Sequence, residues 1–73
     1  MNILNLEVGQ RARVINIEGR KAERRLYEIG IMPGIELQLI TRHPFKGPLV
    51  FKIGSASIAL GRSIAAKIMV KLV

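Results

Sequence analysis

A helix-ending signal and a turn signal follow each other closely in the first half of this chain, and together they force the backbone to reverse. Gly30 suits the left-handed backbone position just past a helix, and Ile31 can then pack back on Leu26, as in a Schellman ending. Pro33 and Gly34 fit the central positions of a type II turn, because proline presets φ and glycine accepts a positive φ. The sequence therefore predicts a short helix that ends and turns back within a few residues.

The helix that precedes these signals is predicted over residues 20–29. Ala22, Leu26 and Ile29 recur at the spacing i, i+4, i+7, which places them on one apolar face. Most of the remaining side chains are charged. We therefore expect the opposite face of the helix to meet solvent or a partner.

Alternating apolar and polar residues predict a strand on each side of the helix. Residues 10–17 form the first strand, but Ile15 and Ile17 fall on the side of the preceding arginines. This irregular phase indicates either a bulge or a strand that is covered on both faces. Residues 35–41 form the second strand, directly after the Pro-Gly turn.

The second half of the chain predicts a hairpin that follows a loop. Strands over residues 49–53 and 56–60 flank Gly54 and Ser55, which fit a two-residue type II′ turn. Residues 42–48 form the loop, because two prolines and a glycine in so short a span prevent regular pairing.

The end of the chain completes a small β architecture. Ser63 is expected to cap one short helical turn, and residues 68–72 alternate as the last strand. Five short strands and one helix predict a single domain over residues 1–73, mainly β. We expect a small SH3-like antiparallel barrel with one short helix between the first two long strands, since closure would hide the edges of so small a sheet.

Composition narrows the function classes. Twelve Lys and Arg against five Glu give a net charge of +7, which favours an anionic partner such as nucleic acid, an anionic membrane surface or an acidic protein. An aromatic content of 4% argues against the stacking platforms of single-stranded nucleic-acid binders. There is no cysteine, no signal-peptide pattern and no apolar run near the roughly 20 residues that span a bilayer, so a soluble, cytoplasmic protein is expected.

No residue set with catalytic or metal-binding spacing is visible. One histidine, no cysteine and no aspartate leave neither an activated nucleophile nor an acid–base pair, so we expect a non-enzyme without a cofactor. His43 lacks the companions that a transition-metal site with three or four ligands needs. Weak metal binding at His43 stays open as an alternative.

Three segments in the order and spacing of one known family give a more specific indication. Residues 24–34, Arg-Arg-Leu-Tyr-Glu-Ile-Gly-Ile-Met-Pro-Gly, resemble the arginine-leucine, glycine and proline-glycine signature of the FeoA family. Residues 43–49 resemble that family's loop before its hairpin, and residues 57–60 and 64–70 resemble its final strand, turn and strand. The resemblance extends over nearly all 73 residues. One departure is Gly61, where the family commonly carries an arginine.

This resemblance implies an SH3-like barrel that serves as a small cytoplasmic accessory of bacterial ferrous-iron uptake. The implied partner is the cytoplasmic region of FeoB, a membrane transporter with a GTP-binding domain. Similar domains also occur at the C-terminus of DtxR-like metal-dependent repressors. We expect a binding module that contacts and regulates a FeoB-type transporter, is recruited by it to the inner membrane face and does not itself insert into the membrane. A nucleic-acid binder and a weak transition-metal carrier are the alternatives, and the oligomeric state stays open.

The contact residues are expected on the charged helix face and in the loop before the hairpin. Two helix cations fall in the first turn, where the dipole disfavours positive charge by about 0.3–1 kcal/mol each, so local stability does not account for them. Tyrosine beside arginines is typical of interfaces. The alternative is a solvated face on which Glu28 pairs with an arginine one turn away. The predicted contact residues are Arg24, Arg25, Tyr27, Glu28, Arg42, Phe45 and Lys46.

Overall fold

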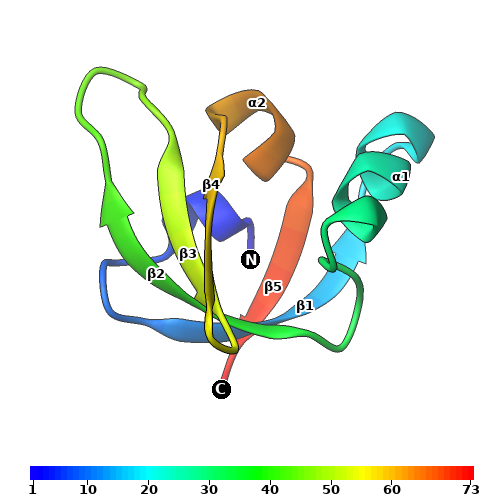
Figure 1. Ribbon diagram of the computed structural model, residues 1–73, viewed down its shortest axis with the longest axis horizontal. Helices are drawn as coiled ribbons and strands as arrows, with labels where there is room; N and C mark the ends of the chain where they lie inside the picture. The colour runs from blue at the N-terminus through cyan, green and yellow to red at the C-terminus, as the bar shows by residue number, and fades with distance from the viewer.

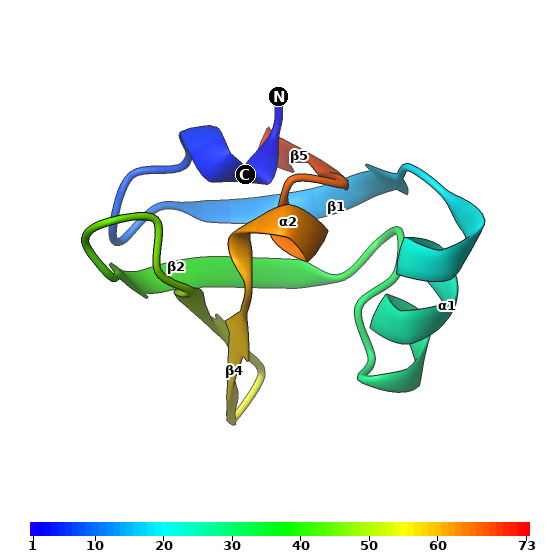
Figure 2. The ribbon, with the colours of Figure 1, turned by 90° about the horizontal axis from the view of Figure 1, so that it is seen from above.

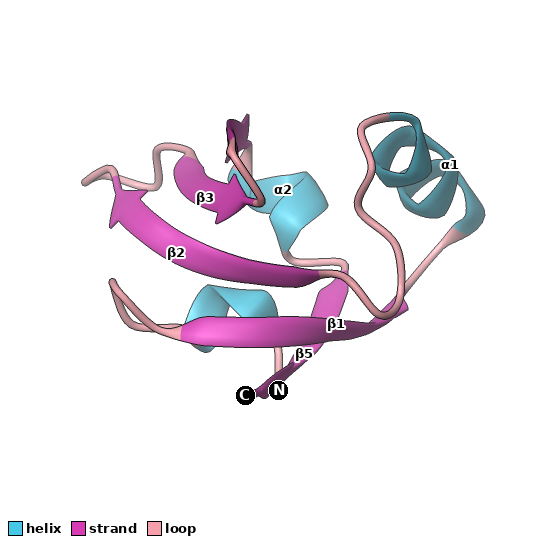
Figure 3. Ribbon diagram, turned by 60° about the horizontal axis from the view of Figure 1, so that its bottom comes forward, coloured by secondary structure: helices cyan, strands magenta, loops and turns pink.

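The computed structural model describes residues 1–73 as five antiparallel strands, one regular helix and two short helical turns (Figure 1). Figure 3 shows the strands as a curved sheet with the long helix at one end. In chain order the elements are η1 (Ile3–Asn5), β1 (Arg11–Ile17), α1 (Arg20–Glu28), β2 (Glu36–Arg42), β3 (Leu49–Ile53), β4 (Ala56–Leu60), α2 (Arg62–Ala65) and β5 (Ile68–Leu72).

The strands form one sheet in the order β4-β3-β2-β1-β5. The mainly β architecture with one helix between β1 and β2 is confirmed, but the prediction of a closed sheet is wrong, because β4 and β5 do not pair. The start of the chain lies where a closing strand would have to bond to β5. The N–H of Val70 donates to the carbonyl of Met1 at 2.7 Å, and Asn2 forms a β-bridge with Met69.

The core is made of aliphatic side chains and one phenylalanine, as the composition requires. Along β2, Leu37 and Leu39 are buried and alternate with more exposed neighbours. No polar or charged residue is buried, so the core needs no internal ion pair. Its members are Ile3, Leu6, Ala12, Val14, Ile17, Leu26, Ile31, Leu37, Leu39, Leu49, Phe51, Leu60, Ala65, Ile68 and Val70.

The predicted end of α1 is confirmed as a Schellman motif. The N–H of Ile31 donates to the carbonyl of Leu26 at 2.8 Å, the N–H of Gly30 donates to that of Tyr27 at 3.0 Å, and Gly30 has φ +88°. The prediction that Ile29 belongs to the buried apolar face is wrong, because its side chain is 46% exposed. The helix ends at Glu28, so Ile31 takes the buried place beside Leu26.

The Pro-Gly turn after α1 is also confirmed. The N–H of Ile35 donates to the carbonyl of Met32 at 3.1 Å, and Gly34 has φ +98°, as a type II turn requires at its third position.

A bulge resolves the irregular phase of β1. The register of β1 against β5 shifts between Val14 and Asn16, so Ile15 is the extra residue and is 51% exposed, while Ile17 returns to the core. A second register shift, which the sequence pattern did not indicate, leaves Ile40 of β2 exposed. Each extra residue bends its strand and helps to curve a sheet that is only five strands wide.

The hairpin prediction is confirmed and the Ser63 prediction is wrong. Ile53 pairs with Ala56 around a two-residue loop in which Gly54 has φ +60°. Gly61, not Ser63, is the N-cap of α2, and it makes no side-chain capping bond. The short turn therefore begins before Ser63 and is held by packing of its buried end against the core.

Candidate partner-contact surface

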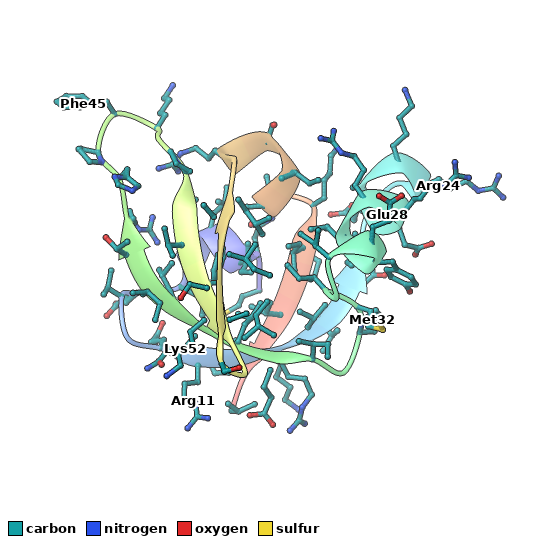
Figure 4. The ribbon with its side chains drawn as sticks, viewed as in Figure 1. Arg11, Arg24, Glu28, Met32, Phe45 and Lys52 are labelled. Carbon is teal, nitrogen blue, oxygen red and sulfur yellow. The ribbon has the colours of Figure 1, made fainter.

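Helix α1 is anchored by one side and exposes the rest. Leu26 is fully buried, which fixes the rotation of the helix about its axis. Arg24, Arg25 and Glu28 are exposed, and Figure 4 shows Arg24 pointing away from the body of the protein. Tyr27 is 44% exposed, so its ring belongs to the surface and not to the core. The structure thus brings the four predicted helix residues together on one exposed element.

The charges of this helix face are not neutralised within the chain. The alternative in which Glu28 pairs with Arg24 or Arg25 is not observed, and the only ion pair of the structure joins Arg13 Nη2 to Glu36 Oε2 at 3.1 Å. Unpaired guanidinium groups keep their donors free for carboxylates of another molecule. A shallow hollow of about 550 Å³ on this face is lined by Arg20, Glu23, Arg24, Tyr27 and Glu28.

The loop between β2 and β3 holds two of the predicted residues out into solvent. Phe45 is 98% exposed, the most exposed large apolar side chain of the protein. Phe45 and Lys46 have φ of +57° and +62°, a conformation that costs residues other than glycine roughly 1–2 kcal/mol each. The N–H of His43 donates to the carbonyl of Pro48 at 3.1 Å and closes the loop behind them.

Arg42, the third predicted loop residue, is engaged inside the molecule. Its Nη2 donates to the carbonyl oxygen of Leu4 at 3.1 Å and also to that of Leu6, and the side chain is half-buried. These bonds tie the end of β2 to the segment around η1. The structure therefore gives Arg42 an intramolecular role that the sequence did not indicate.

The helix face and the loop do not form one surface. Figures 1 and 2 show α1 at one side of the protein and the β2–β3 loop at the opposite side, and Figure 4 places Phe45 and Arg24 at these two extremes. A partner that meets both residues has to span the width of the protein.

Metal and catalytic groups are sparse in the structure. No group of three or more His, Cys, Asp or Glu side chains is close enough to hold a metal ion. His43 is exposed at the start of the loop. No helix is long and apolar enough to cross a membrane.

Sequence reasoning missed a cationic hollow between α1 and α2. Lys21 and Arg25 of α1 lie there with Lys67, which stands between α2 and β5, and the hollow measures about 240 Å³. No carboxylate lines it. Lys67 is too far along the chain for any sequence pattern to link it to α1. The other lining residues are Ala22, Ser63 and Ile64.

A second hollow missed by the sequence lies on the outer side of the sheet. The strand registers set Arg11 beside Gln38 and Gln38 beside Lys52, and Figure 4 shows Arg11 and Lys52 at the same lower side. The hollow measures about 380 Å³. The sequence shows alternating polar residues in each of the three strands. Only the strand registers, however, show that these residues lie side by side.

The fold and its exposed cationic and aromatic side chains place the chain among small β domains that present charged and aromatic groups on their surface. Within this class the assignment is specific: the family model for the FeoA domain matches residues 1–72, and the chain belongs to the FeoA family.

A curated relative links this family to ferrous-iron transport. The chain is 31% identical over 74 residues to the Fe(2+) transport protein A/Fe(2+) transporter FeoB fusion protein of Porphyromonas gingivalis. The match includes 100% of this chain, and the chain spans 9% of the length of that fusion protein.

Solved structures share the fold over nearly the whole chain. An iron uptake regulatory protein, FeoA, has a TM-score of 0.87 at 26% identity, over 100% of this chain and 96% of that one. A Stenotrophomonas maltophilia FeoA complexed with zinc, described as a procaryotic SH3 domain protein, has a TM-score of 0.80 at 26% identity, over 97% and 89%. A manganese-dependent transcriptional repressor with manganese has a TM-score of 0.91 at 25% identity, over 100% of this chain and 36% of that one. The expected SH3-like fold, and its occurrence in repressors, are confirmed.

Proposed function

We propose that this chain is a non-catalytic module that contacts the cytoplasmic region of a FeoB-type ferrous-iron transporter and regulates it. The observation that carries the proposal is the fusion relative, in which a segment matching the whole of this chain shares a polypeptide with a transporter. Fusion holds two modules at a high effective concentration, which favours even a weak contact between them. On this proposal the separate chain is recruited to the inner membrane face by its partner.

The exposed face of α1 supports the first contact. Arg24 and Arg25 are exposed and have no ion-pair partner in the chain, and Tyr27 offers an exposed ring beside them. Arginine and tyrosine are enriched among residues that carry binding energy at interfaces. Glu28 at the end of the helix adds a charge of opposite sign and can select the orientation of the partner.

The β2–β3 loop supports a second contact at the other side of the molecule. Phe45 is fully presented to solvent at its tip, with Lys46 beside it. An aromatic side chain held in a strained, outward conformation gains free energy when a partner buries it. Arg42 contributes indirectly, because its bonds to two carbonyls hold the base of the loop.

Regulation requires that the module prefers one conformation of the transporter. A partner that binds two states equally shifts their populations by nothing, however tightly it binds. Two contacts on opposite sides of a rigid barrel-like sheet supply such a preference, since only one spacing of the transporter's binding points satisfies both.

The test is a binding titration with the soluble cytoplasmic region of the transporter from the same host. The variant Arg24→Glu, Arg25→Glu is expected to weaken binding by at least about tenfold, because two positive charges at the contact become negative and then repel the acidic groups of the partner. The matched control is Arg11→Glu, Lys52→Glu, which makes the same change in net charge at the outer side of the sheet. Equal weakening by both variants would show a non-specific charge effect, and no weakening by either would move the contact away from α1.

The nucleic-acid alternative rests on the net charge of +7 and on the hollow in which Arg11 and Lys52 lie beside Gln38, with one carboxylate, that of Glu36, in the lining. Phosphate binding would weaken by roughly 0.7–0.9 log units in K per log unit of salt for each neutralised phosphate. Steep salt dependence with an oligonucleotide, abolished by Arg11→Glu, Lys52→Glu, would establish this function instead.

The metal-carrier alternative rests on His43. A titration of ferrous iron alone, followed by amide NMR, separates it from the contact function. Saturable shifts centred on His43 would establish a carrier, whereas their absence together with transporter-induced shifts on α1 would establish the contact module.

A further inference from the structure

The two edges of the sheet differ in a way that points to a second binding site. The outer edge of β5 is occupied by the start of the chain, through the bonds between Met1 and Val70. The outer edge of β4 has no such cover, because β3 is the only strand with which β4 pairs. The open sheet therefore ends in one unoccupied strand edge.

The register of the hairpin identifies the free backbone groups on that edge. Ile53 and Ala56 flank the two-residue loop and form a hydrogen-bonded pair, so the pairs alternate from there along the hairpin. Ser57 and Ala59 then fall in non-hydrogen-bonded pairs with β3, and their N–H and C=O groups point outward. None of the turn and loop hydrogen bonds of the protein uses these groups.

Strand β4 also lacks the features that usually protect an edge. Its sequence, Ala-Ser-Ile-Ala-Leu, has no charge, no proline and no register shift against β3. Because the side chains of a strand stand above and below the sheet, those of Ser57 and Ala59 do not block another backbone beside β4 at the usual strand spacing of about 4.8 Å. Ile58 is half-buried and packs against the core, so an added strand would cover apolar surface as well.

The surroundings of β4 indicate the charge of its occupant. α2 starts directly after β4 and Gly61, and Figure 1 shows α2 at the end of β4 with α1 beyond it. The end of the free β4 edge therefore lies next to α2, whose Ser63 and Ile64 line the hollow between the two helices. That hollow presents Lys21, Arg25 and Lys67 and no carboxylate.

We propose that the free edge of β4 accepts an extended acidic segment of a partner protein, whose carboxylates bind Lys21, Arg25 and Lys67 in the hollow between α1 and α2. Backbone hydrogen bonds to Ser57 and Ala59 supply affinity, and the three cations supply selectivity for acidic segments. A second copy of the chain is a poorer occupant, because each copy carries a net charge of +7 and a five-residue strand buries far less than the roughly 800 Å² per partner of a stable interface. This inference is independent of the identity of the transporter.

The probe is a nine-residue peptide of alternating glutamate and valine, acetylated and amidated, with a lysine-valine peptide as its counterpart. Calorimetry measures affinity and amide NMR locates the site. We expect the acidic peptide to bind, with the largest shifts at the amides of Ser57 and Ala59, and the lysine peptide not to bind.

Two pairs of variants separate strand addition from charge attraction. Ala59→Pro removes one outward N–H and should weaken binding about tenfold, whereas Ala59→Ser keeps the N–H and should bind normally. Lys67→Glu should weaken binding about fivefold, and Lys71→Glu, the same charge change outside the hollow, by less than about twofold. Circular dichroism confirms that each variant is folded.

Several results would overturn the proposal. Absence of binding by the acidic peptide, or equal binding of both peptides, would remove the acidic occupant. Equal affinity of Ala59→Pro and Ala59→Ser would show that no strand is added. A dimer of the unmodified chain that Ala59→Pro dissociates, seen by sedimentation equilibrium, would assign the edge to a second copy.

Discussion

The N–H of Ile31 donates to the carbonyl oxygen of Leu26 over 2.8 Å, and both side chains are fully buried. This one backbone bond joins the last turn of α1 to the segment that leads into β2. It holds the end of the helix beside the buried Leu26 side chain, which fixes which residues of α1 face solvent. The position of the candidate contact surface therefore depends on this helix ending.

Replacement of Gly30 tests this ending directly. Gly30→Ala should lower the free energy of unfolding by about 1–2 kcal/mol, because the residue has φ +88°. An added Cβ would meet no atom within 4 Å, so the cost is conformational and not steric. Urea unfolding measures it. Gly61→Ala, at negative φ and equally open, is the control and should cost less than Gly30→Ala. Equal losses for both variants would contradict the assignment.

A comparison of two apolar residues tests which side of α1 is buried. Leu26→Ala should cost about 2–5 kcal/mol of unfolding free energy, because Leu26 is fully buried and its removal leaves a cavity. Ile29→Ala should cost less than about 1 kcal/mol, since Ile29 is 46% exposed. Thermal and urea unfolding of both variants provide the measurement. A larger loss for Ile29→Ala would mean that the helix presents the face predicted from its periodicity.

Arg42 should behave as a structural residue. Arg42→Met should lower the free energy of unfolding by about 1.5–3 kcal/mol, because the carbonyls of Leu4 and Leu6 lose a charged donor. Arg24→Met, which removes an exposed side chain without a partner, should change stability by less than about 0.5 kcal/mol. Chemical denaturation compares them. If Arg42→Met keeps full stability but loses transporter binding, Arg42 acts as a contact residue after all.

Phe45 should behave in the opposite way. Phe45→Ser is expected to leave the free energy of unfolding within about 0.5 kcal/mol, because the side chain is 98% exposed, and to weaken transporter binding. Phe51→Ala, in the core, should cost about 3–5 kcal/mol. Unfolding curves and the binding titration are measured on the same samples. Unchanged transporter binding by Phe45→Ser would exclude the loop from the contact.

Local signals in the sequence predicted much of the fold. The Schellman ending, the Pro-Gly turn and the Gly54-Ser55 hairpin each depend on residues within a few positions of one another, and the structure confirms all three. The irregular phase of β1 left two explanations open, and the structure shows that a bulge is the right one. Two local predictions were wrong, the cap at Ser63 and the burial of Ile29, and the error in sheet closure came from long-range pairing. Periodicity could not tell that the start of the chain would occupy the edge of β5 and keep the sheet open.

The candidate site could likewise be predicted from the sequence only in part. The exposed helix residues Arg24, Arg25, Tyr27 and Glu28 could be chosen from the helix pattern, because burial of Leu26 alone decides which side faces outward. The role of Arg42 could not, since its acceptors lie in the segment around η1, far away in the chain.

The sequence by itself determined the main local turns of this protein, its one regular helix, its charge and its family, because these follow from residue types and short spacings. The tertiary structure alone decided which edge of the sheet stays free, that Arg42 serves the fold, and that Lys21, Arg25 and Lys67 share one hollow. The physical reason is that these relationships depend on strand order and on packing between distant segments, which no local pattern encodes.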